Sequence, residues 1–312
     1  MIEKKRKQEH GVTLIELMVV LVIAAILVGG VYTLFMTQQR SYSVQDQVTG
    51  VQQDARAALS IMTRDIRMAG LLIGSGSDGF NVNGAQFAIT PANGGAGNTD
   101  SITVAYGADE FTSGGNPVTV TSIAGAVVTL SADASSFFDT STDRFVAFEG
   151  DNTVYSISSI STNNLTLTSS PPVYLANVGA RVFRAKSIMY RVQNGELQRA
   201  ENTAAAQPMI GDGTTTVVED LQFAYQVEGV DDCWTFDGQV TGSTETNDAA
   251  LPGTATNADI RMVRINIIVR TAVPDPEETS FFKPASEDNP QSNTDTGCRR
   301  RVYTTVVKAR NL

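Results

Sequence analysis

The sequence predicts an α+β protein in which a long N-terminal helix packs on an antiparallel β-sheet with a small inserted β-domain. The first half of the helix is predicted from an uncharged run of 20 residues, Leu17–Met36, which could cross a bilayer core of roughly 30 Å. Apolar residues then recur at spacings of three and four as far as Met68, as on one face of a helix. The sheet is predicted from short segments after Ser101 in which apolar and polar residues alternate.

Composition restricts the classes of function that the chain can perform. Its 312 residues carry a net charge of −10, and the only histidine, His10, precedes the apolar run. The rest of the chain therefore lacks the imidazole needed for His-based catalytic pairs and His-containing zinc sites. An acidic protein is also poorly suited to bind nucleic acid or anionic lipid surfaces. We expect neither an enzyme nor a nucleic-acid-binding protein, and the remote alternative is a membrane-anchored enzyme.

The start of the chain combines a basic leader with a carboxylate inside the apolar segment. Positive-inside bias would hold the four basic residues at positions 4–7 in the cytoplasm. Glu16 costs about 3 kcal/mol near mid-membrane, so its presence calls for a role. A secretory signal peptide is the alternative for residues 1–30, but the apolar run is longer than the usual core of such a signal.

Two parts of the N-terminal region resemble known proteins. Residues 11–16, Gly-Val-Thr-Leu-Ile-Glu, between the basic leader and the apolar run, resemble the class III signal of type IV prepilins and pseudopilins. Residues 55–59, Ala-Arg-Ala-Ala-Leu, and 62–70, Met-Thr-Arg-Asp-Ile-Arg-Met-Ala-Gly, are similar to the helix end of PilW-type minor pilins. The C-terminal strands and Arg310–Asn311 also resemble that family. Val12 departs from the pattern, because Phe is the commoner first mature residue.

The resemblance implies a type IV pilin-like fold and a processing pathway. Prepilin peptidase would cleave after Gly11 and methylate the new N-terminus at Val12. Removing the leader's four basic and two acidic residues changes the net charge from −10 to −12. In the family, the carboxylate at the position of Glu16 is thought to pair with the amine of a neighbouring subunit, which would offset its cost in an apolar bundle. The alternative is a carboxylate that reaches water at the headgroups.

The chain is predicted to be organised in six parts. In order, these are a leader peptide over residues 1–11, a transmembrane or filament-core helix over 12–37, its amphipathic continuation over 38–72, loops rich in Gly, Ser and Asn over 73–100, an inserted β-rich region over 101–185 and a C-terminal antiparallel β-region over 186–312. Gly70 is predicted to end the helix. Asn194-Gly195 predicts a hairpin turn, and three further strands are expected at 218–227, 260–270 and 301–308.

The two cysteines and several acidic residues lie in the late loops, which are predicted to be exported. Because the periplasm is oxidising, Cys233 and Cys298 are expected to form a disulfide worth about 4 kcal/mol in the chain-entropy model. Two unpaired buried thiols or a two-thiolate metal site are the alternatives. No cofactor is expected. Oxygen ligands for calcium could come from a small acidic set, although solvated loops explain it better: Asp231, Asp232, Glu287, Asp288, Asn289 and Asp295.

The function implied by the resemblance is that of a minor pilin near the pilus tip that helps to start or support assembly. Its partners would be prepilin peptidase, other minor pilins, the major pilin, the inner-membrane assembly platform and a tip adhesin. The protein would cross the inner membrane once, with a cytoplasmic leader and a periplasmic C-terminal domain, and then enter the extracellular pilus. The alternatives are a J-type pseudopilin of a type II secretion system and an adhesin that uses the inserted β-domain.

Overall fold

The computed structural model describes residues 12–76, 80–95, 97–228, 234, 256–275, 282–287, 289–292 and 297–312. The chain divides into two compact units, residues 1–49 and 50–312, which are described separately. One helix, α1 (Leu14–Met68), begins in the first unit and ends in the second. The helix predicted as far as Met68 is confirmed.

In the first unit, α1 begins with a capped turn and continues as an apolar helix. The backbone N–H of Glu16 donates to the Thr13 hydroxyl at 3.3 Å, which satisfies one of the free donors of the first turn. The apolar side chains that follow are exposed along the helix from Leu14 to Met36. By length and composition, α1 is the one helix of the described residues that could cross a membrane.

In the second unit, α1 buries one face and then stops. Val51, Ala55, Ala58, Met62 and Ile66 are buried at helical spacing, as the apolar stripe predicted. The helix ends just before Gly70, which adopts a positive φ of 77°. A Cβ at this position would collide with the Leu312 side chain, so both the backbone conformation and the packing require glycine.

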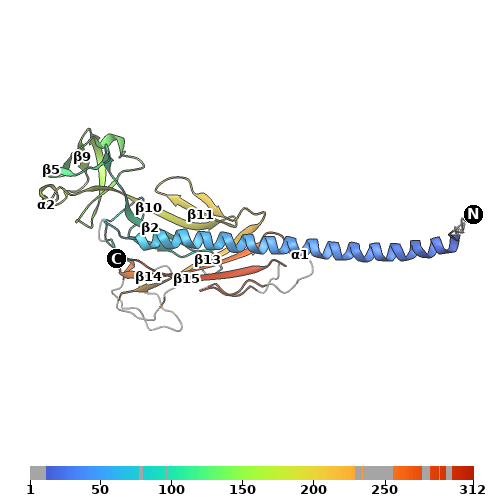
Figure 1. The fold of residues 1–312 in the computed structure, drawn as a ribbon. Helices are drawn as coiled ribbons and strands as arrows, with labels where there is room; N and C mark the ends of the chain where they lie inside the picture. Colours follow the sequence, from blue (N-terminus) through green and yellow to red (C-terminus); the bar gives the residue numbers. More distant parts are fainter. Residues whose placement is uncertain are drawn as a thin grey trace, which may run out of the picture. The chain divides into compact units, whose positions relative to one another are not determined.

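Two antiparallel sheets pack on this part of the helix (Figure 1). The three-stranded sheet has the order β13 (Thr216–Val227), β14 (Ile260–Thr271), β15 (Arg300–Lys308), which confirms the predicted C-terminal strands. The ten-stranded sheet has a main path of eight strands, in the order β1 (Ile89–Ala92), β2 (Ser101–Glu110), β10 (Val182–Gln193), β7 (Phe145–Phe148), β8 (Val154–Ser161), β9 (Asn164–Leu167), β6 (Val127–Leu130) and β5 (Val120–Ala124).

The edge of β10 that does not pair with β2 forms a hairpin that the sequence predicts correctly. β10 continues through Asn194 and Gly195 into β11 (Glu196–Glu201), which pairs with β12 (Gln207–Ile210). Asn194 and Gly195 have φ values of 55° and 78°, as a two-residue type I′ turn requires. The remaining short elements are β3 (Thr112–Ser113), β4 (Asn116–Pro117), α2 (Tyr174–Asn177) and two 3₁₀ turns, Ala134–Ser136 and Asn257–Asp259.

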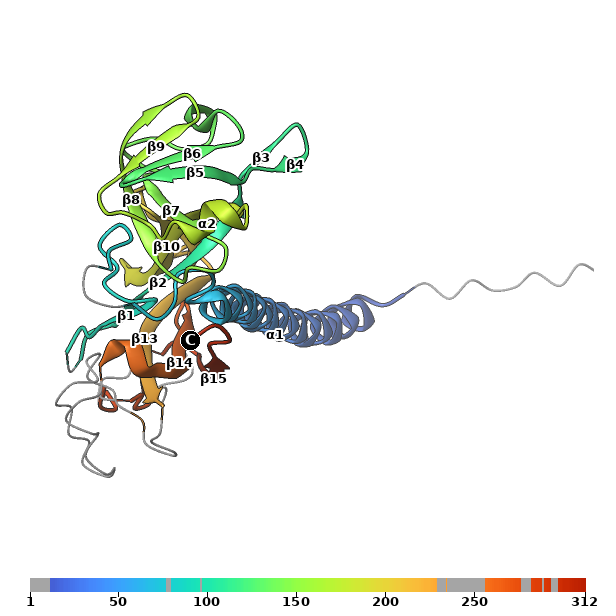
Figure 2. The same cartoon turned by 90° about the vertical axis from the view of Figure 1, so that its left-hand side faces the viewer.

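β10 connects two separate hydrophobic cores. Along one edge of β10, the first residues pair with β7 and the later residues pair with β11. The opposite edge of β10 pairs with β2. Side chains between Phe111 and Val182 form a core of their own, in the lobe that holds β5, β6, β8 and β9 (Figure 2). The α1 core contains side chains from α1, β2, the later part of β10, β13 and β14.

Two predicted boundaries differ from the structure. Strand β2 was expected in the inserted region over 101–185, but Ile102, Val104 and Tyr106 pack in the core of α1. The lobe with its own core therefore begins near Phe111 and ends near Val182. The range 73–100 was expected to be loop, yet β1 forms within it and pairs with β2. Its turn residues suggested loops, whereas pairing with residues 9 to 15 positions further along the chain decided the outcome.

Candidate functional site

The residues predicted to act in processing and assembly lie at the start of α1. Val12 is exposed and directly precedes the helix, and Glu16 is exposed in its first turn. Gly11 lies outside the described residues. A carboxylate in a first turn is favoured by the partial positive charge of the helix N-terminus. Within an apolar bundle it would still need a cation to offset its desolvation.

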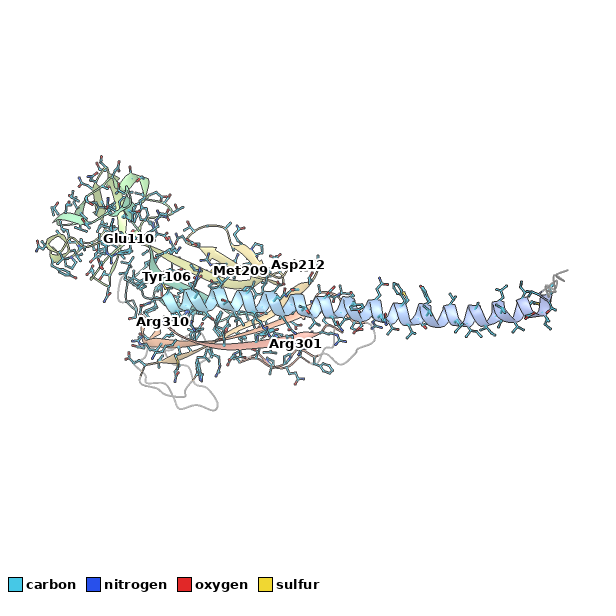
Figure 3. All side chains as sticks on the ribbon, in the orientation of Figure 1. Tyr106, Glu110, Met209, Asp212, Arg301 and Arg310 are labelled. Carbon is cyan, nitrogen blue, oxygen red and sulfur yellow. The ribbon has the colours of Figure 1, made fainter. Side chains whose placement is uncertain are left out.

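A buried carboxylate fixes the other end of α1 to the sheet. Asp65 is 1% exposed, and its Oδ2 accepts hydrogen bonds from the Tyr190 hydroxyl at 2.5 Å and from Arg199 Nε at 3.2 Å. The Tyr106 hydroxyl donates to Oδ1 at 3.4 Å. These partners come from β10, β11 and β2, so one helix residue is tied to three strands (Figure 3, which labels Tyr106).

Strand register brings the partners of Asp65 together. Tyr190 and Arg199 lie opposite each other in the β10–β11 hairpin, and Lys186 lies opposite Tyr106 between β10 and β2. Arg199 also forms an ion pair with Glu201 at 3.2 Å, and Lys186 contacts the same carboxylate at 3.1 Å. The buried charge of Asp65 is thus balanced mainly by the guanidinium of Arg199, which Glu201 holds in place, while the exposed Arg64 makes a longer contact of 3.7 Å.

Both tyrosines of this cluster resist ionisation. Burial first, and the Asp65 carboxylate second, raise the pKa of Tyr106 and the pKa of Tyr190 well above the ordinary 10.0. The folded state therefore keeps both hydroxyls protonated at pH values where the unfolded chain loses the protons. Their contribution to stability is complete below pH 10 and declines as the pH rises above it.

We expect the free energy of unfolding of the full-length protein in detergent to fall steeply above about pH 10. Tyr190→Phe should lower stability by about 1–2 kcal/mol at neutral pH, because Asp65 loses a donor, and should make the alkaline fall shallower. Urea unfolding followed by circular dichroism at a series of pH values measures both effects. Tyr42→Phe, at a residue exposed on α1, is the control and should keep the wild-type slope.

The C-terminal residues complete the end of α1. Arg310 N–H donates to the Arg67 carbonyl at 3.4 Å, and the Asn311 side chain donates to the carbonyls of Arg67 at 3.3 Å and Met68 at 3.5 Å. Helices leave their last carbonyls without partners within the helix, and here the chain terminus supplies the donors. Residues 62–70 and 310–311, which both resemble PilW-type proteins, thus contact each other.

Sequence reasoning missed a second buried carboxylate, Asp220 on β13. Lys283 Nζ lies 2.7 Å from its Oδ2, and Asn289 Nδ2 donates to both carboxylate oxygens at 3.0 Å. Gln222 donates to Oδ1 at 2.9 Å, and both amides also bind the Asn98 carbonyl. This network ties two connecting segments to the three-stranded sheet. The sequence signal was an adjacent acidic pair, Glu219 and Asp220, within a strand that also contains glutamines.

The predicted calcium ligands and disulfide are only partly described. Glu287 binds Arg264 with two hydrogen bonds of 2.7 and 2.8 Å and also accepts from Asn266, so its carboxylate is held by a cation. Four of the predicted ligands lie outside the described residues: Asp231, Asp232, Asp288 and Asp295. Cys298 is buried, and its Sγ accepts from Arg270 at 3.2 Å. Cys233 also lies outside the described residues, so the disulfide and the calcium site stay predictions.

Two stretches of the chain match known protein families. Residues 6–32 match the prokaryotic N-terminal methylation motif, and residues 174–311 match the Type IV Pilus-assembly protein W family, PilW. Among solved structures, a type IV-like pilin from Thermus thermophilus aligns with a TM-score of 0.42 and 11% identity, over 84% of this chain and 97% of that chain. No match was found among curated proteins.

Residues 6–32 thus carry the N-terminal methylation motif found in prepilins, and this motif together with the apolar helix indicates a membrane anchor. Residues 174–311 are similar to the PilW family, and the resemblance predicted from the sequence is confirmed over these two matched stretches. The expected α+β fold, with a long N-terminal helix packed on antiparallel sheet, is also confirmed.

Proposed function

We propose that this protein is a non-catalytic minor pilin that enters a type IV pilus near its tip and helps to start or support assembly. The observation that carries the proposal is the coincidence of the methylation motif, residues 6–32, with the start of the membrane-length helix at Leu14. Cleavage after Gly11 would leave Val12 and Thr13 directly ahead of the first helical turn. The PilW match over 174–311 favours a pilus over a type II secretion system.

Glu16 and the Val12 amine would connect neighbouring subunits. A free amine at a helix N-terminus adds positive charge to the positive end of the helix dipole, which is unfavourable. The Glu16 carboxylate of a neighbour would neutralise this charge, and in return it would gain the cation that an apolar bundle requires. Because the two groups are four residues apart in each chain, their pairing would fix the axial offset between subunits.

The proposed location follows from the same features. The protein is held in the inner membrane by α1, with its leader in the cytoplasm and its β-sheets in the periplasm. It then moves into the filament with other minor pilins and the major pilin, through the inner-membrane assembly platform. The lobe between Phe111 and Val182 would be displayed outside. This bulk suits a subunit at the tip, next to an adhesin, better than a repeating subunit.

Intact mass and N-terminal analysis of the protein purified from its own host test the processing step. We expect a mature chain that begins at Val12 and carries one added methyl group on its amine. A strain without prepilin peptidase is the control and should yield the chain with its leader. A wild-type chain that keeps the leader, or one that begins beyond Gly30, would contradict the proposal.

A further inference from the structure

A groove of about 930 Å³ lies between the C-terminal part of α1 and strand β15. Four arginines line it, Arg56, Arg64 and Arg67 from α1 and Arg310 from the chain terminus, together with Thr304 and Thr305 of β15. No acidic side chain is among the described residues that line this groove. Strand β15 lies beside α1 in Figures 1 and 2. Figure 3 labels Arg310, which follows the end of β15.

Strand β15 has an open edge within the part of the chain that the structure describes. Among the described strands it pairs with β14 alone, in an uninterrupted antiparallel register. The backbone hydrogen bonds that flank this register involve Arg299 and Ala309, which are odd-numbered. Because bonded and non-bonded positions alternate in an antiparallel pair, the even-numbered residues direct their N–H and C=O groups away from β14. Val302, Thr304 and Val306 thus present backbone donors and acceptors at the edge that pair with no strand in the described part of the chain.

The groove is positively charged, whereas the net charge of the protein is negative. The chain without its leader carries −12, yet the groove collects four cations. Among the described residues, no ion pair involves Arg56, Arg67 or Arg310. Arg64, whose side chain is 75% exposed, has one contact of 3.7 Å with Asp65. Like charges gathered in this way repel one another, so a negatively charged partner would be stabilised here.

We propose that the groove binds an extended acidic segment of another filament subunit, which adds to β15 as a fourth strand. Strand addition uses backbone hydrogen bonds for affinity and alternate side chains for specificity. Val302 to Val306 span about 14 Å of edge, enough to pair with roughly five residues. Alternate side chains of the bound segment would face α1, so acidic residues at every second position would meet the arginines. Only the identity of the partner as a filament subunit rests on the proposed function.

The test uses the full-length protein in detergent and a labelled peptide of about nine residues that alternates Glu and Thr. Fluorescence anisotropy should show saturable binding that weakens as salt concentration rises. The double variant Arg64→Glu/Arg67→Glu should lower affinity about tenfold or more. Val306→Pro removes an N–H that points away from β14, so the fold should survive while binding falls by a similar factor. Val306→Thr is the matched control and should bind as the wild type does.

Three further outcomes would overturn the proposal. The first is equal binding of a peptide with Lys in place of Glu, since charge would then play no part. The second is equal binding of a Glu peptide N-methylated at every residue, which has no backbone N–H to donate to a strand edge and serves as a second measurement if Val306→Pro fails to fold. The third is the absence of binding by the Glu peptide. None of these depends on processing at Gly11, so failure here is distinguishable from failure of the minor-pilin assignment.

Discussion

Replacing Asp65 with alanine is expected to destabilise the globular part of the protein by about 3–5 kcal/mol, because it leaves the guanidinium of Arg199 without its buried partner. The hydroxyls of Tyr106 and Tyr190 would lose their acceptor at the same time. Urea unfolding of the full-length protein in detergent, followed by circular dichroism, measures the loss.

The matched control is Arg64→Ala, the exposed neighbour of Asp65 on the same helix turn, which should change stability by less than about 0.5 kcal/mol. The double variant Asp65→Ala/Arg199→Met should recover part of the loss, since no unpaired buried charge remains. A loss below about 1 kcal/mol for Asp65→Ala would show that the carboxylate does not hold α1 to the strands.

Replacing Glu16 with glutamine is expected to reduce incorporation into pili about tenfold or more, without preventing cleavage or membrane insertion. The amide keeps the shape of the side chain but cannot neutralise the amine of a neighbouring subunit. Quantitative immunoblotting of sheared pili and of membranes separates incorporation from insertion, and N-terminal analysis reports cleavage after Gly11.

Asp46→Asn provides the matched control, because it neutralises another exposed carboxylate of α1. It should leave incorporation close to that of the wild type. Normal incorporation of the Glu16→Gln variant would instead favour the alternative in which Glu16 reaches water at the headgroups. The same comparison also tests the subunit connection, because an effect of equal size at Asp46 would indicate a general need for negative charge.

Local sequence patterns predicted most of the secondary structure. The uncharged run and the apolar stripe determine α1, because helical periodicity is a property of residues three and four apart. Asn194-Gly195 determines the hairpin, because both residues tolerate positive φ. The strands β13, β14 and β15 were predicted from alternation and apolar runs, although the open edge of β15 was not.

The errors concern contacts between distant parts of the chain. The alternating pattern in residues 101–106 is the same whether the strand joins the lobe or the helix core, and packing against α1 decides between them. In residues 73–100, glycines favoured loops, but pairing with β2 stabilises β1. Neither outcome can be derived from a local window, because the partner surface comes from elsewhere in the chain.

The sequence by itself determined the motif at residues 11–16, the membrane-length helix, the helix end at Gly70 and the PilW-type resemblance of residues 62–70. It did not show why that last segment carries an aspartate. Only the tertiary structure brings Tyr106, Tyr190 and Arg199 around Asp65, and the chain terminus against the last carbonyls of α1. A carboxylate is stable in a core only when specific donors surround it, and those donors are separated from Asp65 by between 41 and 134 residues.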